Sequence, residues 1–336
     1  MTDSPVLVTG GAGYIGSHAV LALLDAGCRV VVLDDLSNGE REAVPSRAVL
    51  EVGDVADRQL VSRLLARYEI REVLHFAGSV RVDESVMDPL KYYANNTAAS
   101  RNLIAACLEG GVKRFVFSST AAAYGIPATS PVDESAPTEP INPYGWSKLM
   151  TERMLRDAVA AYKGMSVAIL RYFNVAGADP QGRAGQRTKN ATHLIKVASE
   201  VAAGHRPYMQ IFGTDYDTRD GTCIRDYIHV TDLAEAHLAV LEWLKTNGPL
   251  ALFNCGYGRG YTVREVLAAV EKAAGKAFAV QEGPRRAGDP PALVSDARQL
   301  RQIVGWQPRL ADLETIVGTA LAWERKLQKN QLSERT

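Results

Sequence analysis

The chain has 336 residues, enough for one large domain or two modest ones with a substantial core. Its 38 Lys and Arg residues balance 38 Asp and Glu residues, so no overall basic field favours a nucleic acid or a membrane as partner. The four cysteines are scattered without metal-like spacing, which predicts reduced thiols and no bound metal. The sequence opens without a signal-peptide pattern, and no run approaches the roughly 18 apolar residues of a membrane span. We therefore expect a cytoplasmic protein.

Short apolar runs rich in β-branched residues alternate with helical patterns through the first half of the chain. Such alternation predicts crossover units, and hence a parallel sheet with helices on both faces. The expected fold class is therefore α/β, with a doubly wound sheet of the Rossmann type. The predicted strands are 6–8, 29–33, 48–52, 73–76, 114–118 and 167–171, and the predicted helices are 15–24, 57–66, 94–108 and 144–162.

The alternation weakens after residue 175, and residues 174–187 are rich in Gly, Ala, Asp and Pro, as expected of a loop beside a cleft. We expect a Rossmann domain over 1–175, with returning segments near 225–245, and a smaller α/β substrate domain over 176–336. The later predicted helices are 194–203, 230–245, 262–274 and 310–328, and the later strands are 210–212, 253–255 and 277–281.

A glycine-rich turn follows the first predicted strand. Gly11, Gly13 and Gly16 satisfy G-x-G-x-x-G, and Gly10 extends the pattern. Glycines there let the backbone approach a pyrophosphate, which then binds at the positive end of the following helix. Asp34 ends the second strand about 20 residues further on, where a carboxylate accepts hydrogen bonds from the adenosine ribose. Because that carboxylate repels a 2′-phosphate, the sequence predicts NAD rather than NADP as cofactor.

Polar or small residues also follow the neighbouring strands. Asn38 lies after the second strand, and Asp54 with Val55 follows the third, where a short acid can hydrogen-bond an adenine. Residues 76–78 end the fourth strand with small side chains, which let a cofactor lie against the strand edge. Because the carboxyl ends of parallel strands share one edge, all these positions point to a single dinucleotide.

A hydroxyl, a phenol and an ammonium are expected to meet at the same edge. Thr120 follows the fifth strand, and Tyr144 and Lys148 begin the next helix, where residues i and i+4 share a face. A neighbouring ammonium favours phenolate over phenol, so a tyrosine with a reference pKa of about 10 becomes a base near neutrality. A lone Y-x-x-x-K pair occurs often by chance. Together with Thr120 and the glycine-rich turn, the pair indicates proton and hydride transfer.

These motifs together resemble the extended short-chain dehydrogenase/reductase family, and within it the UDP-glucose 4-epimerases, also called UDP-galactose 4-epimerases. The resemblance covers nearly the whole chain. It is carried by residues 9–16, 75–78, 118–125, 143–148, 170–174, 211–213, 221–230 and 285–296. The last three segments are the most specific, because they belong to the sugar-nucleotide branch of the family.

The resemblance implies NAD-dependent 4-epimerisation of a UDP-sugar. Tyr144 would take the proton of the sugar 4-hydroxyl while C4 passes a hydride to NAD. Lys148 and the positive nicotinamide would hold down the pKa of the phenol, and Thr120 would hydrogen-bond the 4-oxygen. The 4-keto sugar would then turn over and take the hydride back on its other face. The family also implies a homodimer through the helices at 95–108 and 147–162.

The resemblance and the motifs together name the expected binding residues. Arg225 and Asn174 would hold the phosphates or sugar, Phe212 would pack by the uracil, and Arg286 with Asp289 would contact the diphosphate and ribose. The expected substrate-binding residues are Thr120, Tyr144, Asn174, His193, Leu194, Phe212, Arg225, Arg286, Asp289 and Leu293. The expected cofactor-binding residues are Gly10, Gly13, Tyr14, Ile15, Gly16, Asp34, Asn38, Asp54, Val55, Phe76, Ala77, Gly78, Asn96, Tyr144, Lys148 and Phe173.

Three positions depart from the best-known family pattern or bear on specificity. Val80 stands where that pattern has a cofactor-contacting lysine, which weakens the predicted grip on NAD and leaves open whether Arg81 replaces that lysine. Residues 192–193, Thr-His, replace Asn-Asn before a helix. Leu293 matches a position where some members have a bulky tyrosine, which predicts room for N-acetylated sugars such as UDP-GlcNAc and UDP-GalNAc.

Other activities on this fold remain open to different degrees. A UDP-pentose or UDP-uronate epimerase is not separated from the hexose enzyme by the sequence. A nucleotide-sugar dehydratase is disfavoured, because its chemistry needs an acid after the threonine and Ala121 and Ala122 follow Thr120 here. A non-catalytic NAD-binding scaffold is expected to lack the Tyr144–Lys148 pair.

Overall fold

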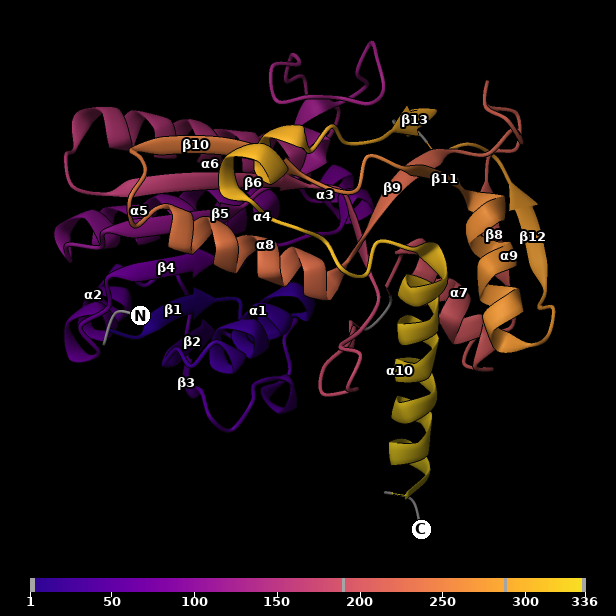
Figure 1. Ribbon diagram of the computed structural model, residues 1–336, viewed down its shortest axis with the longest axis horizontal. Coiled ribbons are helices and arrows are strands. Elements are labelled where there is room, and N and C mark those ends of the chain that lie inside the picture. Colours follow the sequence, from indigo (N-terminus) through magenta and orange to yellow (C-terminus); the bar gives the residue numbers. More distant parts are fainter. Residues whose placement is uncertain (1–3, 189–190, 287–288, 334–336) are drawn as a thin grey trace.

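The computed structural model describes residues 4–188, 191–286 and 289–333. Its larger sheet has seven strands in the order β10-β6-β5-β4-β1-β2-β3, each paired in parallel with its neighbours (Figure 1). The order reverses between β1 and β4, which opens a crevice at the carboxyl ends of the strands. The predicted α/β, doubly wound fold class is confirmed. The strands are β1 (Val6–Thr9), β2 (Val30–Asp34), β3 (Val49–Val52), β4 (Glu72–His75), β5 (Arg114–Ser118), β6 (Ser166–Tyr172) and β10 (Leu250–Cys255).

Helices cover both faces of this sheet, because most of its strands are apolar on both sides. In β1, Val6 and Val8 join the core cluster that contains side chains of α1 and α8. Leu7 points to the opposite face and joins the cluster that contains side chains of α2, α5 and α6. The helices are α1 (Tyr14–Asp25), α2 (Arg58–Arg67), α5 (Ala99–Glu109), α6 (Pro143–Ala161) and α8 (Val230–Trp243).

A second group of strands and helices stands at the carboxyl edge of the larger sheet (Figure 1). Strand β9 pairs with β7, β11 and β13, and β8 pairs with β12 in a separate two-stranded sheet. Three helices share a third apolar core beside these strands. The elements are β7 (Asn174–Ala176), α7 (Leu194–Ala202), β8 (Met209–Phe212), β9 (Ile224–His229), β11 (Gly260–Thr262), α9 (Val263–Ala274), β12 (Val280–Gly283), β13 (Ala292–Leu293) and α10 (Leu313–Ser333).

Several expected elements differ from the structure. The predicted loop over 174–187 opens with β7, because its backbone pairs with β9 from much later in the chain. Strands β11 and β13 are too short to show an alternation in the sequence. The helix expected at 94–108 begins already at Pro89, where the Asp88 side chain accepts a hydrogen bond from the Lys91 amide. From there α4 (Pro89–Tyr92), the π-helical η2 (Tyr93–Ala98) and α5 run on without a break.

Four further short elements complete the described chain. They are α3 (Val82–Met87), the 3₁₀ turns η1 (Arg41–Ala43) and η3 (Ala121–Tyr124), and the π-helical η4 (Leu300–Val304). Helix α8 and strand β10, although late in the sequence, lie with the larger sheet, while the domain boundary at residue 175 stays a prediction. Of the segment 285–296 that carries the family resemblance, residues 287 and 288 lie outside the described residues.

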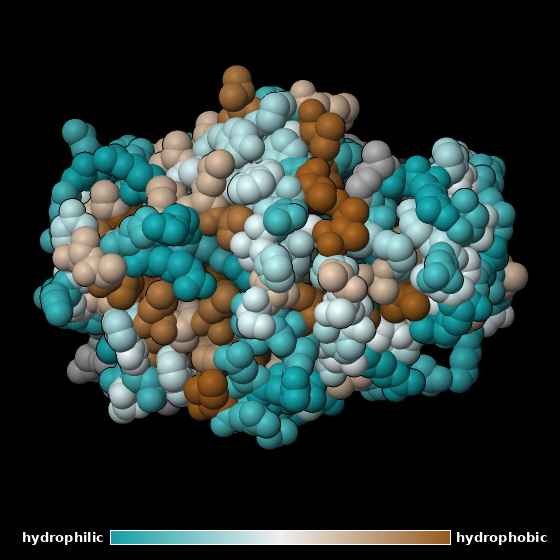
Figure 2. Space-filling view, turned by 90° about the horizontal axis from the view of Figure 1, so that it is seen from above, coloured by the Kyte–Doolittle hydropathy of each residue, from teal (hydrophilic) through white to brown (hydrophobic). Residues whose placement is uncertain are grey.

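None of the helices in the described ranges is long and apolar enough to cross a membrane. The face seen in Figure 2 is largely polar, with apolar side chains in separate groups. All four cysteines are free, and Cys107, Cys223 and Cys255 are buried. Within the residues that the structure describes, no group of His, Cys, Asp and Glu side chains is arranged to hold a metal ion.

Candidate active site

The glycine-rich turn between β1 and α1 lies against the end of β4. A Cβ atom on Gly10, whose φ is +71°, would lie 2.6 Å from the Ala77 nitrogen, and one on Gly16 would lie 2.1 Å from the Gly10 oxygen. Helix α1 begins at Tyr14, and its N-cap Gly13 has no side chain to occupy the first amide groups. This close packing and the free amides of the first turn fit the pyrophosphate of a dinucleotide.

Asp34 is fixed at the end of β2, beside this turn. Its two carboxylate oxygens accept hydrogen bonds from the amides of Ala12 and Leu36, both at 2.9 Å. Burial raises the pKa of Asp34, and these two amide hydrogen bonds lower it in part. Asn38 and Ala12 line the same small hollow. The arrangement orients the carboxylate as expected for a ribose-binding acid.

The remaining cofactor candidates of β3 and β4 also reach this edge. The Asp54 carboxylate accepts a hydrogen bond from the Ala56 amide at 2.8 Å, and Val55 beside it is buried. Phe76 donates its amide to the Thr9 carbonyl, and its ring lies 4.7 Å from that of His237. These positions leave the expected residues grouped around the turn.

Three of the expected cofactor residues have structural partners of their own. The Tyr14 hydroxyl donates to the Gly177 carbonyl at 2.7 Å, and Ile15 packs on the core. Asn96 accepts a hydrogen bond from the Ser79 amide at 2.7 Å and donates to the Ser147 hydroxyl at 3.0 Å. Asn96 therefore ties the segment after Gly78 to α6, and its role in cofactor binding stays a prediction.

Two other positions relate to the expected weak grip on the cofactor. Val80, in the place of the family lysine, is exposed. The Arg81 guanidinium forms an ion pair with Asp83 at 2.7 Å, so its charge is already engaged.

Phe173 is buried in an apolar cluster with Tyr124.

Thr120 and Tyr144 lie together at the carboxyl end of β5. Thr120 is the N-cap of η3, where its hydroxyl oxygen accepts a hydrogen bond from the Ala122 amide at 3.1 Å. Tyr144 stands in the first turn of α6, which is capped by Asn142. Burial raises the pKa of Tyr144, and a hydrogen bond with the Thr120 side chain lowers it in part. The chain thus brings the expected hydroxyl and phenol to the same strand end.

Lys148 follows one turn later and is buried. Its Nζ donates to the Ser118 carbonyl at 3.1 Å and lies 5.0 Å from the centroid of the Phe117 ring. Burial lowers the pKa of Lys148 to about 8, so the ammonium form still dominates at neutral pH. Among the protein side chains alone, burial raises the pKa of Tyr144 more than Thr120 lowers it. The lowering expected from Lys148 together with the nicotinamide stays a prediction.

A buried ion pair near these residues was not anticipated from the sequence. Glu152, one helical turn after Lys148, pairs with Arg171 of β6 at 2.6 Å, and the Ser119 hydroxyl donates to Glu152 at 2.5 Å. The available signal was the spacing, since a carboxylate four residues after Lys148 falls on the same face of the helix. Its partner could not be named from the sequence.

The expected substrate residues fall into groups on the second set of strands. Arg225 of β9 lies opposite Leu293 of β13, and its guanidinium reaches the Asp289 carboxylate at 3.5 Å. Asn174 begins β7, which pairs with the later part of β9 at residues 227–229. At the end of β8, the Arg286 guanidinium lies 3.8 Å from the centroid of the Phe212 ring. A cation and an aromatic face are therefore adjacent, and their part in substrate binding stays a prediction.

His193 and Leu194 stand apart from these groups, at the start of α7. His193 is the N-cap of this helix, and its Nδ1 lies 3.0 Å from the Gln186 amide nitrogen. Burial lowers the pKa of His193, which favours the neutral imidazole. The part of His193 and Leu194 in substrate binding stays a prediction.

The pattern of the NAD dependent epimerase/dehydratase family matches residues 6–256 of the chain. The chain is also 56% identical to a UDP-glucose 4-epimerase from Azospirillum brasilense, over 98% of its own length and 96% of that protein.

Two solved structures resemble the fold closely. One is a UDP-glucose 4-epimerase from Brucella ovis in complex with NAD, with a TM-score of 0.93, 42% identity, and coverage of 96% of this chain and 98% of that one. The other is the UDP-Glc/GlcNAc 4-epimerase of Campylobacter jejuni, with a TM-score of 0.84, 50% identity, and coverage of 96% and 99%.

Substitution of a single glycine tests the turn as the dinucleotide site. We expect Gly16→Ala to abolish binding of the predicted NAD, because its Cβ would overlap the Gly10 carbonyl and displace the start of α1. Gly318→Ala in α10 is the matched control, since a Cβ there meets nothing within 4 Å and a helical alanine adds up to about 1 kcal/mol of stability. The measurement is the NAD content of each purified protein. Equal NAD content in both variants would rule out this turn as the site.

Proposed function

The chain belongs to the NAD dependent epimerase/dehydratase family, and from this we propose that it interconverts the two C4 epimers of a UDP-sugar through a transient 4-keto sugar. The family resemblance expected from the sequence is confirmed, and so is NAD as the cofactor. The observation that carries the catalytic assignment is the close approach of η3 to the first turn of α6, where a Cβ on Gly145 would lie 2.7 Å from the Ala122 carbonyl oxygen. This approach places Thr120 beside Tyr144, with Lys148 one helical turn away.

NAD, when bound, accepts a hydride from the sugar and returns it, so it leaves the reaction unchanged. The glycine-rich turn and Asp34 would hold it, with its reactive end toward the carboxyl end of β5. A cofactor that is regenerated in place has no need to leave between turnovers. NAD is therefore expected to stay with the purified protein.

Three side chains would handle the proton. Tyr144 would take it from the sugar 4-hydroxyl and return it after the sugar has turned. Thr120 would hydrogen-bond the 4-oxygen as well as the phenol, which links the two reacting oxygens. Lys148, charged at neutral pH, would supply the positive charge that the buried phenolate needs, since burial by itself raises the pKa of Tyr144.

The nucleotide would bind across the second group of strands. Phe212 and Arg286 offer a ring and a cation in contact, and Arg225 offers a guanidinium fixed beside Asp289. A guanidinium is suited to a diphosphate because its planar fork can donate two hydrogen bonds at once.

Loss of one hydroxyl tests the catalytic assignment. We expect Tyr144→Phe to lower kcat on UDP-galactose by about 10²–10⁴-fold, because the proton acceptor is removed. NAD content and UDP binding should stay near those of the wild type. Tyr162→Phe is the matched control, since that tyrosine is exposed just after α6. The assay measures epimer formation from several UDP-sugars, pentose and uronate forms included, and wild-type turnover by Tyr144→Phe would exclude this residue as the base.

The sugar range is proposed to include N-acetylated hexoses. The UDP-Glc/GlcNAc 4-epimerase of Campylobacter jejuni, to which the chain is similar, supports this extension. Leu293 is half-buried and packs against the apolar cluster around Phe173. A leucine at this point of β13 takes less room than a tyrosine, which would leave space near the sugar.

A change at this position tests the sugar range. We expect Leu293→Tyr to lower kcat/KM for UDP-GalNAc by about 10–200-fold, while UDP-galactose turnover changes little, because the added ring fills the space for the acetamido group. Leu293→Met is the control, since it keeps the volume nearly constant. Steady-state assays with both substrates measure the ratio. Undetectable turnover of UDP-GalNAc by the wild type would contradict the proposed range.

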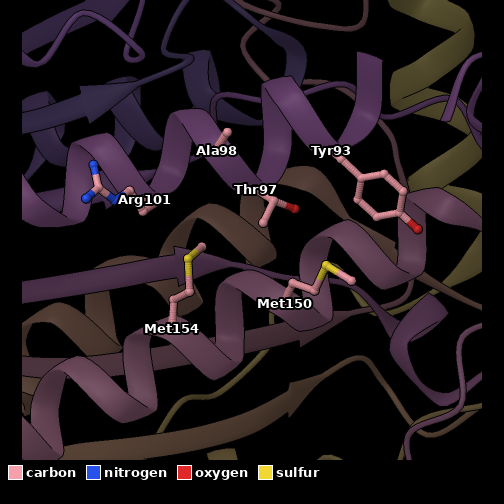
Figure 3. A pocket seen from close by; sticks show the side chains of 6 residues that line it. All are labelled: Tyr93, Thr97, Ala98, Arg101, Met150 and Met154. Carbon is pink, nitrogen blue, oxygen red and sulfur yellow. The ribbon is translucent and has the colours of Figure 1, made fainter. Parts of the chain in front are cut away.

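A second copy of the chain is proposed to pack on η2, α5 and α6. Figure 3 shows Met150 and Met154 of α6 facing the neighbouring helical turns across a shallow hollow. The lining is almost entirely apolar, and 41% of the Met150 surface is exposed. The hollow is lined by Tyr93, Thr97, Ala98, Arg101, Met150 and Met154.

The homodimer, the cytoplasmic location and the domain boundary stay predictions.

A charge placed in this hollow tests the dimer. We expect Met150→Glu to turn a dimeric wild type into monomers, because a buried unpaired carboxylate is costly. Met87→Glu should stay dimeric, since Met87 on α3 is exposed and lies outside the hollow. Sedimentation velocity measures the mass of each protein. A monomeric wild type, or dimers of Met150→Glu, would contradict the proposed interface.

A further inference from the structure

The ion pair of Glu152 and Arg171 is almost completely buried. The side chains are 1% and 4% exposed. Arg171 donates from Nε to Oε1 of Glu152 at 2.9 Å and from Nη2 to Oε2 at 2.6 Å. This two-pronged contact fixes the relative orientation of both planar groups, and therefore of α6 and β6.

Ser119 joins this pair to the strand end that carries Thr120. Its hydroxyl donates to Glu152 Oε1 at 2.5 Å, and its amide donates to the Leu170 carbonyl at 2.8 Å. The preceding residue, Ser118, accepts the hydrogen bond of Lys148. Ser118 and Ser119, which are adjacent at this strand end, thus contact Lys148 and Glu152, respectively. The two contacted side chains lie one turn apart on α6.

Arg171 also reaches the segment on the other side of Thr120. Its guanidinium carbon lies 4.7 Å from the centroid of the Tyr124 ring, and the Tyr124 hydroxyl donates to Asn254 at 2.7 Å. Tyr124 ends η3, the short helix that Thr120 begins. Thr120 is therefore flanked by two residues that the same ion pair holds.

We propose that Ser119, Glu152 and Arg171 form a positioning cluster that fixes the Tyr144 and Lys148 face of α6 relative to Thr120. The cluster rests on the proposed function, because its purpose is the alignment of that proton-handling site. Alignment matters because a misplacement of about 1 Å can cost about 100-fold in rate. Stability alone does not account for the cluster, since the cost of desolvating a buried pair offsets much of its attraction.

The test compares Glu152 of α6 with Glu72 of β4, two glutamates that each form an ion pair with an arginine of the larger sheet. Glu152→Gln removes the charge from the cluster, and Glu72→Gln does the same to the ion pair of Glu72 and Arg114, which are joined at 2.6 Å. Glu72 is also buried, but it lies at the amino end of β4, at the opposite edge of the sheet. We expect Glu152→Gln to lower kcat about 100-fold, with unchanged NAD content and UDP affinity, and Glu72→Gln to keep its kcat. The measurements are kcat, KM, UDP titration by calorimetry and thermal unfolding.

Ser119→Ala is the second variant, because it weakens the cluster without leaving a charge unpaired. If Glu152→Gln does not fold, Ser119→Ala carries the test, with a smaller fall in kcat and an unchanged KM expected. Equal losses of kcat in the two glutamate variants, or unchanged kcat in folded Glu152→Gln or Ser119→Ala, would overturn the positioning cluster. Failure of the wild type to epimerise any UDP-sugar would instead overturn the proposed function.

Discussion

The buried ammonium of Lys148 is the charge around which the side chains at the carboxyl edge of the larger sheet are arranged. Among the described residues no carboxylate pairs with it, and its contacts are the Ser118 carbonyl and the face of the Phe117 ring. A buried cation held by a dipole and a ring stays available to a neighbouring negative charge, whereas a salt bridge would neutralise it. The cost appears as the lowered pKa of Lys148. The close packing of the other residues of the site keeps the Lys148 ammonium buried.

Helix α6 and the strands beside it divide the work. The first two turns of α6 carry the phenol and the ammonium, and the turn after them carries the carboxylate that fastens the helix to β5 and β6. The His75 imidazole stacks on Phe117 with ring centroids 5.6 Å apart, and its nitrogens lie 2.7 Å from the Thr9 hydroxyl and 2.8 Å from that of Ser100. Burial lowers the pKa of His75 to about 3, so no second positive charge competes with Lys148. Lys148 therefore keeps its positive charge at this edge of the sheet, and His75 stays neutral.

The larger sheet was predictable because its strands are buried on both faces and rich in β-branched residues, as in 30–34 and 166–172. The glycine-rich turn and the Tyr144–Lys148 pair were visible because their spacing is local. Strand β9 and its partners β7, β11 and β13 were missed, because they pair with one another across long separations in sequence. The burial that raises the pKa of Tyr144 was hidden for the same reason, since it depends on residues that no local pattern names. The partner of Glu152 is again non-local.

The position of β10 at the edge of the larger sheet has a consequence for how the chain is made. Strand β6 pairs on its outer side with β10, which is synthesised much later. Until residues 250–255 leave the ribosome, the Val-Ala-Ile-Leu run of β6 presents unpaired backbone groups along an apolar edge, a template for association with other chains. A chain released before residue 250 would therefore contain the glycine-rich turn, but the outer edge of its β6 would be unpaired and prone to associate with other chains. In a growing chain, β10 acts as the closing strand that ends this exposure.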